Sequence, residues 1–159
     1  MDYSITYKGK SLDEDLYSID LDAKVFSSDK DALVIDFRGK YGWTFNTGER
    51  CVLNTSSGCT FKTGDGCTFN TGGDCTFYTG GSCTFHTGYD CTFYTGYDCT
   101  FKTGGRCVFT TGNWCTFSVY GISSQTFKRG SSGVMIDREG GNPYILNEEF
   151  IRLQKILKG

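Results

Sequence analysis

The sequence predicts an all-β protein that forms a parallel β-solenoid, a rod in which the chain winds in stacked coils. Three observations predict it: an eight-residue repeat through the middle of the chain, alternation of apolar and polar residues within each repeat, and an unusual composition. The 159 residues include 22 Gly, 13 Phe and 10 Tyr but a single Pro. Gly, Thr and aromatic residues together are typical of short strands joined by tight turns, and a fixed period indicates a repeat architecture.

The repeat is an octad that is clearest from Trp43 onward. The copies read WTFNTGER, CVLNTSSG, CTFKTGDG, CTFNTGGD, CTFYTGGS, CTFHTGYD, CTFYTGYD, CTFKTGGR, CVFTTGNW and CTFSVYGI. We extend the frame backwards to Ile35, which places Phe37 at position three, and forwards, after a slip of two residues, to a decayed copy from Gln125. The repetitive body is then 35–132, between an N-terminal capping segment, 1–34, and a C-terminal cap, 133–159.

Each octad divides into a strand, C-T-F-x, and a turn, T-G-x-x. Side chains alternate along a strand, so positions one and three share one face, and we expect Cys and Phe to form the core. The glycine at position six is expected to supply the positive φ of the turn. The expected core cysteines are Cys51, Cys59, Cys67, Cys75, Cys83, Cys91, Cys99, Cys107 and Cys115. The expected core phenylalanines are Phe61, Phe69, Phe77, Phe85, Phe93, Phe101, Phe109 and Phe117.

The sequence allows either two or three octads in one coil. Two octads would make a flat rod with coils of about 16 residues, and three would make a triangular rod with coils of about 24. We favour two, with each Cys facing a Phe of the opposite strand so that small meets large. The variable positions show no clean alternation over two octads, and the triangular coil therefore stays open.

The repeats resemble known solenoids in architecture. The C-T-F-x-T-G octad is similar to the β-rolls of RTX toxins, which also place two repeats in a coil, and to pentapeptide-repeat solenoids. The octad itself resembles repeats of uncharacterised bacteriophage proteins. This resemblance covers the repeats alone and implies no activity, although it suggests a phage or virion component. The RTX calcium signature GGxGxD does not occur in the octad frame.

Both ends of the rod need caps, because a terminal rung exposes an unpaired sheet edge. We expect N-terminal strands near 3–7, 16–21 and 32–37. At the C-terminus, VMIDREGGNPYIL predicts two strands around a Gly-Gly-Asn-Pro turn. An amphipathic helix is then expected to begin at Asn147 and to cover the last rung, with partner docking as the alternative. Its apolar stripe is Phe150, Leu153, Ile156 and Leu157.

The cysteines raise the question of metal or redox chemistry. Structural metal sites use Cys pairs a few residues apart with convergent ligands, whereas here the spacing is eight and the chain has one His. Disulfides between coils are sterically conceivable, but nine is an odd number and no secretion signal is evident. We therefore predict free thiols that act as small buried apolar groups, with no metal and no cofactor.

Outward aromatic residues in the middle copies are the candidate binding residues. They are Tyr78, His86, Tyr89, Tyr94 and Tyr97. Exposed aromatic rings suit a binding surface, although aromatic stacking that only stabilises the sheet explains them nearly as well.

Four turn carboxylates are the other polar candidates. Asp74 and Asp90 would share one edge in a two-octad coil, Asp98 is at the same position of its octad, and Asp65 is at position seven. A cation bridging the first two is a further hypothesis, and solvated turn residues are the simpler interpretation.

The bulk properties narrow the function. A net charge of −2 and a pI of about 5.3 give no basic footprint, so nucleic acid is not the expected partner. No apolar run has the length of a membrane span and the N-terminus lacks a signal-peptide pattern, so we expect a cytoplasmic or virion protein.

Enzyme activity is not expected, because the sequence has no phosphate loop, nucleophile elbow or paired acid and base. No small-molecule substrate is evident. We expect a non-catalytic structural or protein-binding solenoid that binds a protein or itself. The alternative is an inhibitor that binds a host protein or nucleic acid along the rod.

Overall fold

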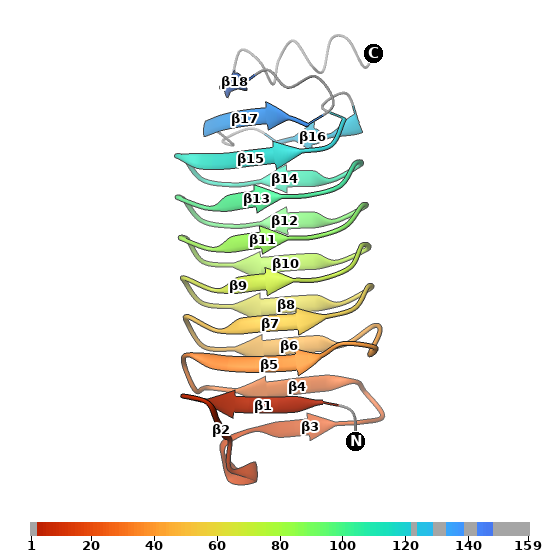
Figure 1. Ribbon diagram of the computed structural model, residues 1–159, viewed down its shortest axis with the longest axis vertical. Helices are drawn as coiled ribbons and strands as arrows, with labels where there is room; N and C mark the ends of the chain where they lie inside the picture. The colour runs from red at the N-terminus through yellow and green to blue at the C-terminus, as the bar shows by residue number, and fades with distance from the viewer. Residues whose placement is uncertain (1–2, 122–123, 129–132, 139–142, 148–159) are drawn as a thin grey trace.

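The computed structural model is a flattened parallel β-solenoid of two facing sheets (Figure 1). It describes residues 3–121, 124–128, 133–138 and 143–147. One sheet, here sheet A, has the strand order β18-β17-β15-β13-β11-β9-β7-β5-β1-β2, and the other, sheet B, has β16-β14-β12-β10-β8-β6-β4-β3. Successive strands of the chain alternate between the sheets, and parallel partners such as Thr68 and Thr84 lie 16 residues apart. The expected two-octad coil is confirmed, and the coils make about seven turns.

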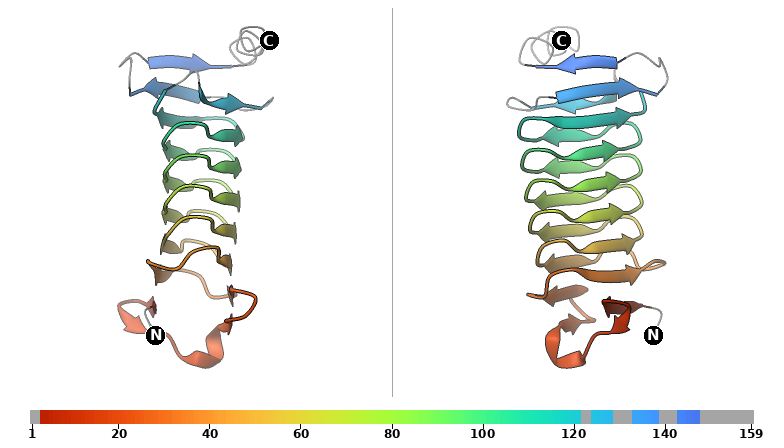
Figure 2. Two further views of the ribbon diagram at one scale, coloured as in Figure 1. Left: turned by 90° about the vertical axis from the view of Figure 1, so that its right-hand side faces the viewer. Right: turned by 60° about the vertical axis from the view of Figure 1, so that its left-hand side comes forward.

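The strands are short and follow the octads. In sheet A they are β5 (Leu33–Phe37), β7 (Val52–Thr55), β9 (Thr68–Asn70), β11 (Thr84–His86), β13 (Thr100–Lys102) and β15 (Cys115–Val119). In sheet B they are β4 (Val25–Ser28), β6 (Thr44–Thr47), β8 (Thr60–Thr63), β10 (Thr76–Thr79), β12 (Thr92–Tyr94), β14 (Val108–Thr110) and β16 (Thr126–Phe127). Their in-register pairing leaves backbone groups bonded to the coils above and below (Figure 2).

Antiparallel strands close both ends of sheet A. At the N-terminal end, β1 (Ser4–Tyr7) pairs with β5 and with β2 (Lys10–Ser11). In sheet B, β3 (Ser18–Asp20), which follows a short 3-10 helix (Glu14–Leu16), pairs with β4. At the C-terminal end, β17 (Gly133–Asp137) continues sheet A and pairs with β18 (Pro143–Leu146), as the two-strand prediction expected. The helix expected from Asn147, with its stripe at Phe150, Leu153, Ile156 and Leu157, lies outside the described residues.

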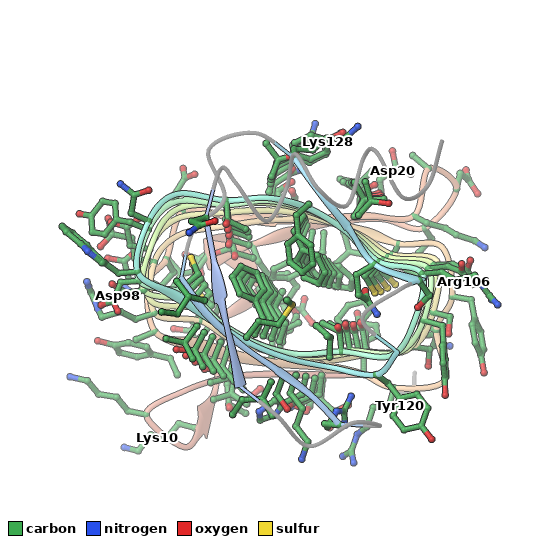
Figure 3. The ribbon with its side chains drawn as sticks, turned by 90° about the horizontal axis from the view of Figure 1, so that it is seen from above. Lys10, Asp20, Asp98, Arg106, Tyr120 and Lys128 are labelled. Carbon is green, nitrogen blue, oxygen red and sulfur yellow. The ribbon has the colours of Figure 1, made fainter. Side chains whose placement is uncertain are left out.

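The core of each regular coil contains two Phe and two Cys, with two buried or half-buried Thr at its margin. Every predicted core Cys and Phe is buried. The expected Cys-against-Phe arrangement is wrong, because Phe faces Phe: the rings of Phe69 and Phe77 lie 5.2 Å apart at 74°. Along the rod axis the rings stack, with Phe77 and Phe93 4.9 Å apart at 5°. Seen down the axis, the side chains of successive coils superimpose in columns (Figure 3).

The threonine at position five completes this core and was not predicted. It lies beside the Cys that follows it across the turn, as Thr55 does with Cys59. Thr103 is fully buried, and its hydroxyl donates to the carbonyl of Gly104. Antiparallel directions of the two facing strands explain the arrangement, since position five of one strand then opposes position one of the other.

Positive φ occurs at position eight of the turn, so the expectation for position six is wrong. Asp90 and Asp98 have φ of 60° and 58°. The glycine at position six is required instead by close packing of coils, because a Cβ on Gly88 would lie 2.8 Å from the backbone nitrogen of Gly73. Asp and Asn tolerate the left-handed conformation better than other residues, which fits the aspartates at position eight.

The octad frame at the N-terminal end differs from the expected one. Ile35 pairs with Leu53 at position three, so Phe37 lies at position five and not at three. Parallel pairing already begins at β4, where Phe26 pairs with Phe45. At the other end, Phe127 pairs with Phe109, which confirms Gln125 as position one of a further copy.

Candidate functional site: the outer surfaces of the rod

The two-octad coil gives the rod four outer surfaces. They are the outer face of sheet A, the outer face of sheet B, a first edge of turns that lead from sheet B to sheet A, and a second edge of turns that lead from sheet A to sheet B. In Figure 3, Asp98 marks the first edge and Arg106 the second. Residues eight apart in sequence therefore lie on opposite sides of the rod, while residues sixteen apart are neighbours.

The five predicted binding residues do not form one patch. Tyr78 and Tyr94 lie on the sheet B face and His86 lies on the sheet A face. Tyr89 belongs to the turn between β11 and β12 on the second edge, and Tyr97 to the turn between β12 and β13 on the first. The structure thus brings together one pair out of the five.

That pair, Tyr78 and Tyr94, is an ordered aromatic stack. The two rings lie 5.0 Å apart at 3°, and the side chains are 47 % and 44 % exposed. Lys62 precedes Tyr78 in register and Thr110 follows Tyr94. The backbone register holds both rings parallel, so little side-chain freedom is left to lose on binding.

The sheet A face carries a hydrogen-bonded polar ladder. The side-chain nitrogen of Asn70 donates to Oδ1 of Asn54 at 2.8 Å. This orients Oδ1 of Asn70 toward His86, whose Nδ1 lies 3.2 Å away and donates to it. The ladder therefore holds the imidazole in the Nδ1–H tautomer, with Nε2 as the acceptor.

A groove of 420 Å³ lies beside this ladder where the sheet A face meets the second edge. Its wall includes Tyr41, Ser56, Ser57, Asn70 and His86. Tyr41 belongs to the turn 38–42, which is two residues longer than a regular turn such as 56–58. Oγ of Ser56 accepts a hydrogen bond from the backbone nitrogen of Gly39 at 2.8 Å and so attaches this turn to the next coil.

The longer turn has a packing cause. At this coil Phe37 and Trp43 replace the Thr and Cys that face each other elsewhere, with ring centroids 5.0 Å apart. Two aromatic rings need a wider edge than Thr and Cys, and the longer turn provides it. The expected frame missed Tyr41 for this reason, and the loss of the C-T-F-x-T-G pattern at 38–42 is the signal that could have found it.

Trp114 is a second exposed residue that the sequence reasoning missed. It occupies position eight on the first edge with a φ of 61°, and its side chain is 76 % exposed. A large aromatic residue is unusual in this conformation, which most coils fill with Asp or Gly. Its signal in the sequence is the single Trp at a turn position.

On the second edge, Asp90 forms an ion pair with Arg106 of the next coil. Nε and Nη2 of Arg106 donate to the two carboxylate oxygens of Asp90 at 2.8 and 2.6 Å. These hydrogen bonds lower the pKa of Asp90 below its usual value. The carboxylate proposed to share a cation with Asp74 is thus paired with a guanidinium, and Asp98 lies on the opposite edge.

The nine thiols form two buried ladders, five in sheet A and four in sheet B. None is in a disulfide. Each sulfur lies near turn carbonyls, as Sγ of Cys91 does with the oxygens of Tyr89 at 3.5 Å and Gly72 at 3.8 Å. Hydrogen bonding to Cys107 and burial raise the pKa of Cys91 to about 11. Within the described residues, His, Cys, Asp and Glu form no group of three that could hold a metal ion.

Comparisons with protein-family models, with curated proteins and with solved structures find no match to this chain. In the described part of the chain, no helix has the length and apolar character needed to cross a membrane. Within this parallel β-solenoid the constant Cys and Phe are buried, and most residues at the variable positions are exposed.

Proposed function

We propose that the protein is a non-catalytic rod that binds a protein, either another copy of itself or a component of a phage-like assembly, through the sheet B face. The observation that carries the proposal is the parallel, half-exposed stack of Tyr78 and Tyr94. Tyrosine contributes a large and rigid contact area with a polar end, and such residues dominate many protein interfaces.

The arrangement around the stack supports a protein partner. The threonines at position two, such as Thr76 and Thr92, pair in register beside the tyrosines and leave the centre of the face uncharged. Lys62 stands at one end of the stack, in register with Tyr78. An uncharged aromatic centre with a charged residue at its margin is the usual pattern of a protein interface.

The test measures association of the full chain before and after the stack is removed. Native mass by sedimentation, and co-purified proteins, are compared for the natural chain and for Tyr78→Ser/Tyr94→Ser. The matched control is Tyr89→Ser/Tyr97→Ser, which removes two exposed tyrosines from the edges. We expect the stack variant alone to lose association. A chain that stays monomeric without a bound protein, or that associates equally well without the stack, contradicts the proposal.

A further inference from the structure

We infer that the groove at the junction of the sheet A face and the second edge is a binding site for an uncharged saccharide. The inference is independent of the proposed function, because the groove lies on the opposite face from Tyr78 and Tyr94. It rests on three features of the groove: its shape beside a prominent aromatic ring, the mixture of donors and acceptors in its wall, and the lack of charge there.

The first feature is the position of Tyr41. The long turn 38–42 projects at the right of Figure 1 beside β5, and the Tyr41 side chain on it is 62 % exposed. The groove of 420 Å³ that it borders is shallow and open to solvent, so a ligand would lie across it with one face exposed. A sugar ring has an apolar face of C–H groups, and an exposed aromatic ring at the side of a groove offers that face a matching surface.

The second feature is the hydrogen-bonding capacity of the groove wall. Oγ of Ser57 accepts from the backbone nitrogen of Gly73, which leaves its hydroxyl hydrogen to donate. Ser56 accepts from Gly39 in the same way.

The polar ladder supplies further groups. Asn70 uses one amide hydrogen toward Asn54 and retains the other. Nε2 of His86 has no hydrogen-bond partner among the described residues and is an acceptor in the tautomer that Asn70 imposes. The wall thus presents free donors at Ser56, Ser57 and Asn70 and an acceptor at His86. Hydroxyl groups, each of which both donates and accepts, can bond to both kinds of group.

The third feature is the charge of the site. The wall is formed by Tyr, Thr, Ser, Asn, His and Gly, with no Lys, Arg, Asp or Glu. Within this wall a phosphate, a sulfate or a carboxylate would give up water and contact no cation, which is costly, since Lys102, in register with His86, is not part of the wall. The wall therefore favours a neutral saccharide over a nucleotide or an acidic glycan. The ladder holds Asn70 and His86 in place before binding, which reduces the entropic cost.

The test is titration of the full chain with neutral oligosaccharides of glucose, galactose, mannose and N-acetylglucosamine, four to six units long. Shallow sites bind weakly, so binding is followed by ligand-observed NMR, which detects dissociation constants up to about 10 mM. We expect at least one saccharide to bind. Tyr41→Ala should raise its dissociation constant about tenfold or more, which is a loss of about 1.4 kcal/mol of binding free energy. Asn70→Ala is expected to weaken binding as well, and Tyr97→Ala, on the first edge, is the control that leaves binding unchanged.

Two results would overturn the inference. One is that no neutral oligosaccharide of the panel binds, or that a heparin-derived anionic oligosaccharide binds in place of them. The other is that binding persists in Tyr41→Ala, which would place the saccharide elsewhere on the rod. Circular dichroism of each variant checks that the solenoid is retained, and Tyr41→Phe, which keeps the ring, is expected to bind within about twofold of the natural chain.

Discussion

The inside and the outside of the rod follow different rules. Inside, the same residue recurs in both sheets, so that Phe77 meets Phe69 and Phe85 across the core and Phe61 and Phe93 along the axis. Outside, side chains contact neighbours of the same turn, as Arg50 does Glu49, or of the coils above and below, and the four surfaces vary independently. Interior positions are therefore constrained by every adjacent coil, whereas an outer residue can change to suit one surface without disturbing the others.

The largest effect should follow a substitution in the middle of the phenylalanine stacks. Phe85 packs against four other Phe rings, and Phe127 near the C-terminal end packs against two among the described residues. We expect Phe85→Ala to lower the free energy of unfolding by about 3–5 kcal/mol. Phe127→Ala should cost clearly less. Urea denaturation followed by circular dichroism measures both, and equal losses would show that the stacks do not act through their ring neighbours.

The turn glycines test whether a position at the edge of the rod can be constrained by adjacent coils in the same way as a core position. Gly88 has no room for a Cβ against the backbone of Gly73, so we expect Gly88→Ala to cost about 2 kcal/mol. Gly66 has a φ of +68° and more space, and Gly66→Ala should cost about 1 kcal/mol from backbone strain alone. Gly66→Asp is the control and should cost less still, because Asp90 adopts this conformation. A reversed order in thermal denaturation would refute the close-packing account of position six.

The thiol ladders should give a smaller, pH-dependent effect. Cys91→Ala is expected to cost about 1 kcal/mol near neutral pH. The folded pKa of about 11 lies above the ordinary value of 9.0, so the native state holds the proton more tightly than the unfolded state. Stability from this group is therefore complete below pH 9 and is lost as the pH rises through 11.

The readout for the thiols is the unfolding midpoint measured from pH 8 to pH 11.5, a span that brackets both pKa values. The natural chain should lose more stability over that span than Cys91→Ala does. Parallel curves for the two proteins would mean that the pKa of the Cys91 thiol does not differ between the folded and unfolded states. Alkylation of the folded chain at neutral pH should also be slow, because the thiols are buried.

The smallest effect is expected at the Asp90–Arg106 pair on the second edge. The Arg106 side chain is 68 % exposed and that of Asp90 38 %, and exposed ion pairs contribute little. Asp90→Asn should leave the unfolding midpoint at neutral pH within experimental error. The pKa of Asp90 is lowered, so its contribution is present above its usual range and is lost as the pH falls below it. A large loss at neutral pH, unaffected by added salt, would mean that the exterior also supports the fold.

The sequence was sufficient for the architecture because the period is visible in the residues themselves. The octad identified Cys and Phe as buried, and the Gly-Gly-Asn-Pro turn identified the C-terminal strand pair. It did not reveal which residues face one another. A period shows which positions are equivalent, whereas the pairing across the core depends on where the turn ends, and Thr55 at the inner side of the turn faces Cys59.

The candidate sites were harder to predict than the core. Tyr78 and Tyr94 were both expected to face outward, and they lie stacked because their spacing of sixteen is one full coil. Tyr41 could not be placed, because the aromatic pair of Phe37 and Trp43 changes the length of the turn and shifts the frame. Position eight shows the same limit. Residues as different as Asp90 and Trp114 share its left-handed conformation, so their identities do not reveal it.

The alternation of octads between two sheets has a consequence for how such a gene can change in length. Removing one octad, for example 91–98, would move every downstream residue to the opposite face, so that Lys102 would leave the row of His86 and join that of Tyr78. It would also transfer the C-terminal cap from sheet A, where β1 closes the other end, to sheet B. Loss or gain of two octads preserves every face. Changes in length that preserve the surfaces of this rod therefore come in pairs of octads, although the repeat visible in the sequence is a single octad.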